Sequence, residues 1–566
     1  METAFATLLH MEERIREVVG KALAEAGAPS ATFSVEWPAD PAHGDFATNA
    51  AMAAAKVLGR NPKELAEELA GKVKSALSED AADVSVAGPG FVNITLASAA
   101  VRRVAEDALT DEWGNANGEA GLRVMIEYGN PNPFKEMHIG HMMGAIIGES
   151  ISRLSEAEGA KVLRDTFGGD VGPQVAKALW ALMKDGVTDV ASAQEIGKAY
   201  IHGSAAYEES ETAKKEIDDL NVRIYRVVEA DPNTLSGDDR ALLSLWRKGR
   251  EVSMEEFNRI FALLGTRHDY AFFDSETTAP GMTLVNEALA KGVLEESEGA
   301  IVYKGEKKGL HTLVFVTSRG TPTYETKDFG LALIKEERAE TDQVIIVTAI
   351  EQVGHFKVVL AALEDVAPAL AKKTTHVAHG LLTLTTGKMS SRKGNVITAA
   401  ELIREVIEKA SEKNDDPLIA EQVAIGALKY MILRSAPGAN VVFDPEKSLS
   451  LDGDSGPYLQ YALVRAKKLL ASDTKSAGDA TPTEPYAIER LIIRFPAVVA
   501  RAAKERAPHH LTQYLTQLAA AWNSFYANEQ VLGSPEETYK LRIANTFANT
   551  MTKGLTLLGI PTPERM

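Results

Sequence analysis

The sequence contains no cysteine and no stretch of about 18 uninterrupted apolar residues. The first absence excludes disulfide bonds and zinc sites built from thiolates. The second makes a membrane-spanning helix unexpected. Residues 1–20 also lack the basic start and small-residue cleavage site of a secretory signal, and have instead the pattern of an amphipathic helix. We therefore expect a cytoplasmic protein that has no membrane partner.

Positive charge is also scarce, because 61 lysine and arginine residues face 79 acidic ones, a formal net charge of −18. This balance argues against a broad surface for nucleic acid. The acid is unevenly spread, however. Residues 451–566 contain 13 basic and 11 acidic residues, a net of +2, which leaves −20 on residues 1–450. The C-terminal part can therefore still offer a local surface for phosphate groups.

The 566 residues are too many for a single hydrophobic core, so we expect three or more domains. Residues 1–112 combine helix and strand patterns, which predicts a small α+β domain. Residues 113–450 alternate strands and helices, which predicts a Rossmann-like, doubly wound parallel sheet. A helical insertion interrupts this α/β domain at about 186–255, and stem helices begin at about 399. Residues 451–566 are predicted to be all helical.

Local signals define several elements within these domains. Asn61-Pro62 marks the start of the second of two helices in the first domain. The stretch "DVSVAGPGFVNITL" (83–96) reads as two strands about a Gly-Pro-Gly turn. In the α/β domain, "LRVMIEYG" (122–129) reads as its first strand. We expect "HTLVFVTSRG" (311–320) to continue the same strand–helix alternation.

The tetrapeptide "HIGH" (138–141) stands where the first strand of the α/β domain gives way to a helix. A helix N-terminus offers free N–H groups and a positive dipole to an anion. His138 and His141 are three residues apart and share a face, and Gly140 leaves room for a nucleotide. Two imidazole donors there suit the charge that develops on a phosphate under attack. The alternative is an ordinary helix start with two polar residues facing water.

A second candidate site is "TTGKMSSRKGNVIT" (385–398), which combines turn-forming residues and cations in one short loop. Such a loop can close over a polyphosphate. It is not a Walker A loop, because the G-x-x-x-x-G-K-[ST] spacing is absent. Taken alone, it can equally be a solvated basic loop.

Together, the two motifs resemble the paired signatures of the class I aminoacyl-tRNA synthetases. The resemblance extends to the arginyl-tRNA synthetase family over nearly the whole chain. The matching stretches run in order along the sequence: "GDFATNAAMAAAK", "GPGFVNITL", "EYGNPNPFKEMHIGH", "GGDVGPQ", "YETKDFGLAL", "DSGPYLQYALVRA" and "LLGIPTPERM". This resemblance implies a tRNA-binding N-terminal domain, a Rossmann-like catalytic domain and a helical anticodon-binding domain. It also implies that arginine and ATP form arginyl-adenylate, and that arginine then passes to tRNA(Arg).

The resemblance implies a set of site residues. The catalytic residues would be Lys135, His138, His141 and Lys388. ATP, with Mg²⁺ as its counter-ion, would contact these four and also Gly140, Met389, Ser390, Ser391 and Lys393. Arginine would bind to Glu127, Asn132, Tyr324, Asp328 and Gln352. The tRNA would contact Tyr458, Gln460, Tyr461 and Arg465. We expect no metal ligands on the protein itself, and we expect a monomer.

The chemistry of the proposed arginine-binding residues supports this reading. Tyr324 and Asp328 are four residues apart and so share a helix face. A carboxylate beside an aromatic ring is a good receptor for guanidinium. Glu127 ends the first strand, where it can add a second acidic contact. Asn132 and Gln352 offer neutral amides to the α-amino or carboxylate group. Each residue alone can equally be a surface or capping residue.

Two positions depart from the family pattern. Met142 and Met143 stand where the family often has a Leu-Arg pair, and Lys327 stands where it usually has arginine. Two other functions remain as alternatives. One is a class I synthetase for glutamate, glutamine or cysteine, although the cysteine enzyme's zinc thiolates are missing and a glutamate pocket would need arginines. The other is an inactive relative that only binds tRNA, which the intact motifs disfavour.

Overall fold

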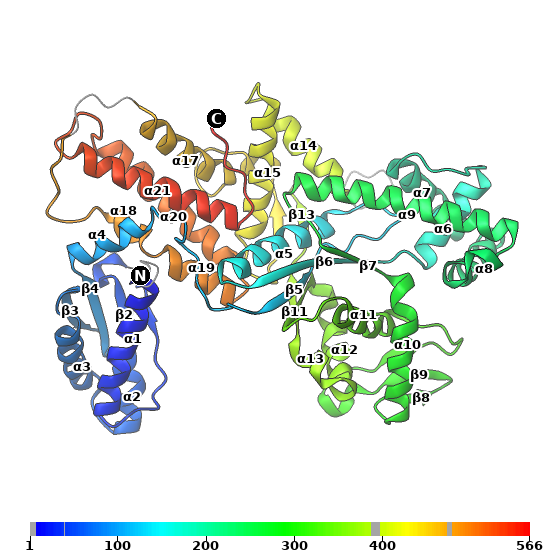
Figure 1. Cartoon of the computed structure of the whole chain (residues 1–566), viewed down its shortest axis with the longest axis horizontal. Coiled ribbons are helices and arrows are strands. Elements are labelled where there is room, and N and C mark those ends of the chain that lie inside the picture. Colours follow the sequence, from blue (N-terminus) through cyan, green and yellow to red (C-terminus); the bar gives the residue numbers. More distant parts are fainter. Residues whose placement is uncertain (1–6, 39, 386–396, 473–477) are drawn as a thin grey trace.

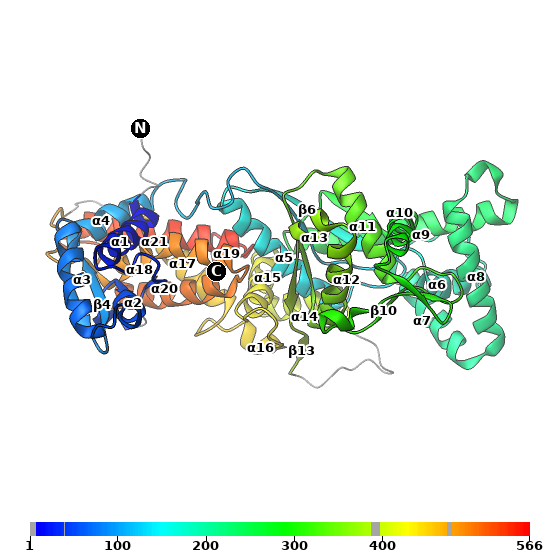
Figure 2. The same cartoon turned by 90° about the horizontal axis from the view of Figure 1, so that it is seen from below.

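The structure is a computed structural model that describes residues 7–38, 40–385, 397–472 and 478–566. The chain forms an elongated molecule (Figure 1). A small domain lies at one end, a helical body at the other, and a parallel sheet between them (Figures 1 and 2). Within the described residues, none of the helices combines the length and the apolar character that crossing a membrane requires.

The N-terminal domain is a four-stranded antiparallel sheet with order β1-β2-β4-β3, covered by helices. Its elements are α1 (Thr7–Glu25), β1 (Val35–Glu36), β2 (Phe46–Thr48), α2 (Ala50–Leu58), α3 (Pro62–Ala76), β3 (Ala81–Ala87), β4 (Phe91–Leu96) and α4 (Ser98–Asp107). The predicted helix start is confirmed, because Asn61 caps α3 by accepting a hydrogen bond of 2.8 Å from the backbone N–H of Lys63. The predicted strand pair about the Gly-Pro-Gly turn is also confirmed as β3 and β4.

The middle of the molecule contains a five-stranded, all-parallel sheet with strand order β12-β11-β5-β6-β7. Its strands are β5 (Arg123–Glu127), β6 (Lys161–Gly168), β7 (Tyr270–Phe273), β11 (Gln343–Ala349) and β12 (Thr374–His379). After β5 the chain adds β6 and then β7 on one side of the sheet. It then returns and adds β11 and β12 on the other side of β5. This reversal between β5 and β11 leaves a crevice at the C-terminal ends of the two strands, where such sheets bind ligands.

Helices cover both faces of this sheet. On one face lies α5 (Ile139–Ala157), which packs with Ile126 and Ile345. On the other, α11 (Tyr324–Arg338) and α12 (Val353–Val366) pack with Met125 and Ile346. Neighbouring residues of one strand thus point to opposite faces, as the period of a strand requires. The remaining elements around the sheet are α10 (Asp274–Ala290) and α13 (Pro368–Lys373).

The expectation for residues 311–320 was wrong. Their strand, β10 (Leu313–Val316), does not join the parallel sheet. It pairs antiparallel with β9 (Ala300–Tyr303), which in turn pairs with β8 (Glu295–Ser297), as a small separate sheet. A short apolar run signals a buried strand but does not say which partner it finds. A further short strand, β14 (Val441–Phe443), pairs with β13 (Leu382–Leu384), within a region that was expected to be nearly all helical.

The insertion is larger than expected. Its helices are α7 (Ala193–Glu209), α8 (Glu211–Glu229) and α9 (Gly237–Leu263), and they share a hydrophobic core with α6 (Pro173–Lys184). The expected end at residue 255 falls inside α9, which continues unbroken for eight more residues. Figure 1 shows this body projecting away from the sheet.

Among the described residues from Ala399 onward, the regular elements are helices and the strand β14. Its helices are α14 (Ala399–Ser411), α15 (Pro417–Leu433), α16 (Pro445–Ser448), α17 (Gly456–Leu470), α18 (Ala487–Ile492), α19 (Phe495–Lys504), α20 (His509–Asn528) and α21 (Glu537–Leu557). The end of α21 is held by helices of the α/β domain. Arg153 of α5 donates to the carbonyl of Thr556 at 2.8 Å, and Lys429 of α15 donates to that of Gly559 at 2.6 Å. The same α5 therefore contacts the crevice at its start and α21 near its end.

Candidate active site

A cavity that is open to solvent lies at the C-terminal ends of β5 and β11, and its empty space, with the solvent at its mouth included, is about 1330 Å³. Its lining contains eight of the residues predicted to bind ATP or arginine: Glu127, Asn132, His138, Gly140, His141, Tyr324, Asp328 and Gln352. These residues come from positions 127 to 352 of the sequence, and the crevice of the sheet brings them together. The predicted nucleotide and amino-acid sites therefore face one common space.

The two histidines form a stacked pair at the start of α5, with ring centroids 3.5 Å apart. The Nδ1 of His138 accepts hydrogen bonds from the backbone N–H groups of Gly140 (3.1 Å) and His141 (3.4 Å). The Nδ1 of His141 accepts in turn from the N–H of His138 at 3.4 Å. An imidazole nitrogen that accepts an N–H bond carries no proton, so the proton of each neutral ring lies on Nε2.

The charge of the pair follows from its surroundings. Burial lowers the pKa of His138 to about 4, helped by the positive charge of Lys135. Burial also holds the pKa of His141 well below its usual range, with His138 and Lys135 adding to the effect. Both rings are therefore neutral at pH 7, and each presents one Nε2–H donor.

This geometry corrects the expectation of free N–H groups at the start of α5. The N–H of Ile139 donates to the carbonyl of Ile397 at 3.3 Å, and the next two N–H groups donate to His138. The backbone donors are thus already used by the capping arrangement. The donors left for an anion are the two imidazole Nε2–H groups.

The basic loop residues Lys388, Met389, Ser390, Ser391 and Lys393 lie outside the described residues. The structure describes the chain on either side of these loop residues. The segment after the loop runs beside the HIGH segment, because Thr398 bridges to His138 and the N–H of Ala399 donates to the carbonyl of Met137 at 2.8 Å. Residues 397–399 therefore lie beside the two histidines.

Lys135 is positioned differently from the expectation. Its ammonium lies over the ring of Tyr200 of α7, 5.6 Å from the ring centroid. It lines a separate crevice formed with the insertion and α14, and it is not among the residues that line the main cavity. Its charge still reaches His138, as the lowered pKa shows. In this conformation Lys135 is a neighbour of the cavity and would have to leave Tyr200 to contact a phosphate.

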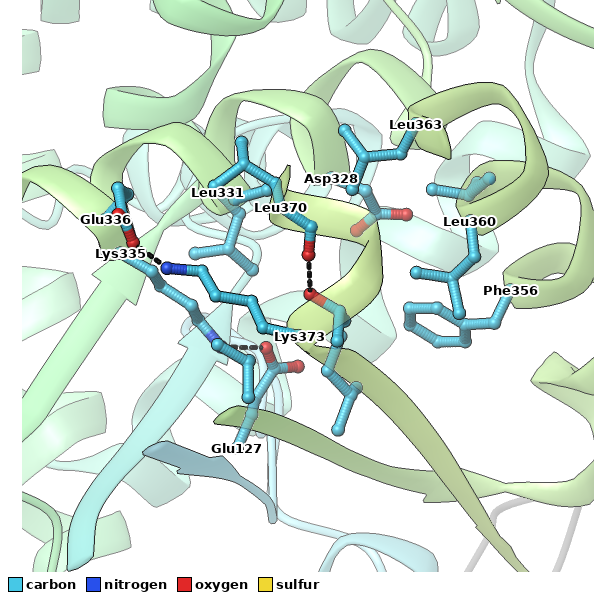
Figure 3. A pocket seen from close by; sticks show the side chains of 15 residues that line it. Glu127, Asp328, Leu331, Lys335, Glu336, Phe356, Leu360, Leu363, Leu370 and Lys373 are labelled. Atoms are coloured by element: carbon cyan, nitrogen blue, oxygen red, sulfur yellow. Dashed lines mark hydrogen bonds and ion pairs between the residues drawn. The ribbon is translucent and has the colours of Figure 1, made fainter. Parts of the chain in front are cut away.

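Glu127 ends β5 with a carboxylate that already has partners. It is 2% exposed and accepts hydrogen bonds from Lys335 of α11 (2.6 Å) and Asn130 (2.7 Å). The same Lys335 ammonium lies 2.8 Å from Asp165 of β6, which is fully buried. Figure 3 shows Lys335 joined to Glu127 beside an apolar cavity, whose lining includes Leu331, Leu360 and Leu363. The charge of Glu127 is therefore largely neutralised before any substrate binds.

Asp328 keeps one carboxylate oxygen, Oδ1, without a hydrogen-bond partner among the described residues. Its Oδ2 lies 2.5 Å from the Nε2 of His355 of α12. Burial raises the pKa of Asp328, and the hydrogen bond to His355 opposes that rise. Tyr324 stands one helical turn before Asp328, is 66% exposed and lines the same cavity. The predicted shared face of Tyr324 and Asp328 is thus directed at the cavity.

The two amides differ in how free they are. Asn132 accepts a hydrogen bond of 2.8 Å from the N–H of Gly169 through its Oδ1, which leaves its amide N–H₂ group for a ligand. Gln352 lies exposed on the rim, in the turn between β11 and α12.

The positions that depart from the family pattern have structural roles. Lys327 is buried and donates to Asp274 of α10 at 2.6 Å, and it reaches the hydroxyl of Tyr225 of α8 at 3.4 Å. It therefore ties α11 both to α10 and to the insertion. Met142 and Met143 are buried in the core between α5 and its neighbours.

The cavity residues that the sequence reasoning missed include Glu325, His355 and His379. His355 follows Gln352 by three residues. Residues with this spacing at the start of a helix share a face, so the predicted role of Gln352 could have drawn attention to His355. His379 ends β12, and its Nε2 would lie 3.3 Å from a Cβ added at Gly144 of α5. His379 could have been predicted from its place at the end of a strand, because ligands bind at strand ends in such sheets.

The predicted tRNA contacts on α17 divide into two groups. The prediction for Gln460 is wrong for this structure, because its side chain is fully buried and donates to the carbonyls of Gln422 (3.1 Å) and Pro561 (2.8 Å). Tyr458, Tyr461 and Arg465 are half-buried and share one face of the helix. The Arg465 guanidinium lies 4.3 Å from the ring centroid of Tyr526 of α20.

Comparisons with known families agree with this architecture. Residues 106–444 match the family described as tRNA synthetases class I (R), catalytic domain. Residues 11–96 match the arginyl tRNA synthetase N terminal domain, and residues 459–566 match the DALR anticodon binding domain.

Individual relatives match over almost the full chain. The arginine–tRNA ligase of Chromobacterium violaceum is 31% identical, with 98% of this chain and 100% of that protein aligned. That of Treponema pallidum is 29% identical, over 98% and 99%. The solved arginyl-tRNA synthetase of Thermus thermophilus superposes with a TM-score of 0.79 and 26% identity, over 98% of this chain and 100% of that one. The chain therefore belongs to the arginyl-tRNA synthetase family of class I synthetases.

Proposed function

We propose that this chain ligates arginine to tRNA(Arg) in two steps. In the first, the arginine carboxylate attacks the α-phosphate of magnesium-bound ATP, which forms arginyl-adenylate and releases pyrophosphate. In the second, the 2′-hydroxyl of the terminal ribose of the tRNA attacks the arginyl carbonyl, and AMP leaves. Positioning and electrostatics supply most of the catalysis in such phosphate chemistry.

At the nucleotide end, His138 and His141 would each donate an Nε2–H to the phosphate oxygens. Because both rings are neutral, they stabilise charge that develops in the transition state without holding the ATP tightly beforehand. Gly140 leaves the backbone accessible. Lys135 would swing from Tyr200 toward the leaving pyrophosphate. The loop residues Lys388, Met389, Ser390, Ser391 and Lys393 would close over the polyphosphate, and Mg²⁺ would arrive with it.

At the amino-acid end, Asp328 would bind the guanidinium through a charged hydrogen bond, with the Tyr324 ring beside it. The free amide of Asn132, together with Gln352, would hold the α-amino and carboxylate groups. Glu127 would support this end through a hydrogen bond while Lys335 neutralises most of its charge. Five carboxylates line the cavity, namely Glu127, Asp274, Glu325, Asp328 and Glu351. Lysines pair with Glu127 and Asp274, whereas Glu325 and Asp328 share the single imidazole of His355, so a cationic side chain suits the cavity and an acidic one does not.

The observation that supports this function best is the pairing of an acidic end with two neutral imidazole donors in one cavity. The direct test is ATP–pyrophosphate exchange measured with each amino acid in turn, in the presence of tRNA. Exchange with arginine alone is expected. Exchange with glutamate or glutamine would favour another class I synthetase, and no exchange with any amino acid would favour an inactive tRNA-binding relative.

The first prediction concerns the basic loop. Lys388→Ala should lower the rate of adenylate formation by about 10²–10³-fold, the usual scale for one preorganised donor to a transition state. The KM for arginine should change little, because the lysine acts on phosphate. Single-turnover adenylate formation measures the rate, and Lys413→Ala, at an exposed lysine after α14, serves as the control. An unchanged rate with a raised arginine KM would assign the loop to the other substrate.

The second prediction is that arginine-dependent pyrophosphate exchange requires tRNA. Lys135 rests on Tyr200 of the insertion, so the nucleotide end is incomplete in this conformation, and binding of the correct tRNA would complete it by induced fit. Exchange should be compared in protein freed of RNA with ribonuclease, before and after adding tRNA. Robust exchange in the RNA-free protein would contradict the prediction.

For the tRNA itself, we propose that the anticodon-binding domain uses the face of α17 that carries Tyr458, Tyr461 and Arg465. Aromatic rings and an arginine suit unstacked bases and phosphates, respectively. We expect the enzyme to act as a cytoplasmic monomer, which sedimentation of the tRNA-bound and free forms would check.

A further inference from the structure

His355 lies in the first turn of α12 with its imidazole between two carboxylates of α11. Its Nε2 is 2.5 Å from the Oδ2 of Asp328, and its Nδ1 is 3.6 Å from the Oε1 of Glu325. All three side chains line the main cavity. Within the described residues, His355 is the only cation within ion-pair distance of Asp328.

The neighbouring basic groups do not serve as the cation beside Asp328. Lys327 and Lys335 are also close to the acidic end, but Lys327 is paired with Asp274 and Lys335 with Glu127. His376 of β12 also interacts electrostatically with His355. Burial lowers the pKa of His376 to about 4, so the His376 ring is neutral, and its Nε2 is bonded to the hydroxyl of Thr348. Glu127 of β5 adds negative charge near Asp328.

The imidazole of His355 is charged while the cavity is empty. Burial alone would lower its pKa, but the hydrogen bond to Asp328 and the nearby carboxylate of Glu325 outweigh burial and raise that pKa to about 10. A planar cation with two N–H donors directed at carboxylates has the essential features of a guanidinium. The empty cavity therefore already holds a substitute for the side chain that the proposed function assigns to it.

We infer that His355 is the resting counter-ion of Asp328, and that arginine binds by replacing it while His355 releases one proton to solvent. This inference rests on the proposed function. The charge on Asp328 stays at −1, and the guanidinium takes the place of the imidazolium as its partner. The imidazole keeps the proton on the Nδ1 that faces Glu325. The release follows because the imidazole loses the 2.5 Å contact with Asp328 that chiefly holds its proton, and because the guanidinium that takes this place repels a second cation in a partly dry cavity.

This exchange makes His355 a residue that determines specificity. Citrulline has the shape of arginine but no charge, so it cannot neutralise Asp328 and would have to displace an existing ion pair without replacing it. The cavity would therefore reject neutral analogues more strongly than a bare carboxylate would.

The test is the pH dependence of the arginine KM in aminoacylation with saturating tRNA and ATP. Between pH 6.5 and 8.5 the KM for arginine should fall about tenfold per pH unit, because binding releases one proton. The KM for ATP should not follow this trend. In His355→Gln, which keeps a neutral donor, the slope should disappear. In His376→Gln, at the neighbouring neutral imidazole, the slope should remain.

A flat profile in the native enzyme, or a slope that persists in His355→Gln, would overturn the inference. Calorimetry of arginine binding to the native enzyme, in two buffers of different ionisation enthalpy, gives a second readout that needs no variant. About one proton released at pH 7.5 supports the inference, and none released refutes it. If the enzyme charged a different amino acid and not arginine, the proposed function itself would be wrong, and that result is distinct from a flat arginine profile.

Discussion

Replacing Asp328 by asparagine should lower kcat/KM for arginine by roughly two to four orders of magnitude. The change keeps the shape of the side chain and removes its charge, which leaves a cationic substrate in a partly dry cavity without its partner. Loss of one partner from such a pair costs about 3–5 kcal/mol, and about 1.4 kcal/mol corresponds to a tenfold change. Binding of ATP should barely change, because Asp328 lies on α11 and the histidines lie at the start of α5.

Citrulline provides the control for Asp328→Asn. A neutral substrate gains nothing from the carboxylate charge, so the substitution should penalise citrulline less, and the preference for arginine over citrulline should shrink. Both substrates should be measured with both enzymes in aminoacylation. An equal loss for the two substrates would mean that Asp328 supports the fold and does not recognise charge.

Replacing Lys335 by methionine should destabilise the catalytic domain by about 3–5 kcal/mol at pH 8. The ammonium neutralises two buried carboxylates, Glu127 and Asp165, and removing it leaves both without a counter-ion. For a domain of this size the loss corresponds to a fall of about 5–10 °C in the calorimetric Tm. The domain's own transition should be followed, since a chain with several domains does not unfold in one step.

The pH dependence of this loss has a definite sign. Burial raises the pKa of Asp165 to about 7, while Lys335 lowers it and Glu127 raises it. Because this folded-state pKa lies above the unfolded value of about 3.9, the protonated form favours the folded protein, and that contribution is lost as the pH rises through 7. Removing Lys335 pushes the pKa higher still, so the deficit of Lys335→Met should be larger at pH 8 than at pH 5.

The matched control is Lys373→Met, at the second lysine of the same apolar cavity (Figure 3). Lys373 pairs with Glu336, which is partly exposed, so its loss should cost no more than about 1 kcal/mol. Adding Asp165→Asn to Lys335→Met should restore part of the stability. Equal Tm values for the two single variants would show that the buried pairs contribute nothing special.

Much of the fold could be predicted from local sequence patterns. The cap at Asn61, the strand that ends at Glu127 and the helix that follows His138 all depend on residues within a few positions of each other. The placement of β10 could not be predicted, because four apolar residues form the same local strand in either sheet. The extent of the insertion was also missed, because its core includes α6, which the strand–helix alternation assigns to the sheet domain.

The residues of the site could be predicted, whereas their charges and hydrogen-bond partners were harder to predict. Strand ends and helix faces placed Glu127, Asp328 and His141 at one cavity. The partners of these residues come from distant segments, and no spacing signals them. The ammonium of Lys335 neutralises Glu127 across 208 positions of sequence. Gln460 was expected to contact tRNA because the family resemblance implied it, whereas the structure buries it and uses it to bind the carbonyl of Pro561.

The connection of α5 to both the ATP end of the cavity and α21 has a mechanical consequence. A helix of 19 residues is a stiff rod of roughly 28 Å, and over that length a tilt of about three degrees displaces the far end by roughly 1.5 Å. A misplacement of that size is enough to cost about 10²-fold in rate. A displacement of Arg153 by its carbonyl partner Thr556 would therefore be transmitted along α5 to His138 and His141 at the other end. Whatever bends the end of α21, even with no change near the nucleotide, should appear first as a slower adenylation step.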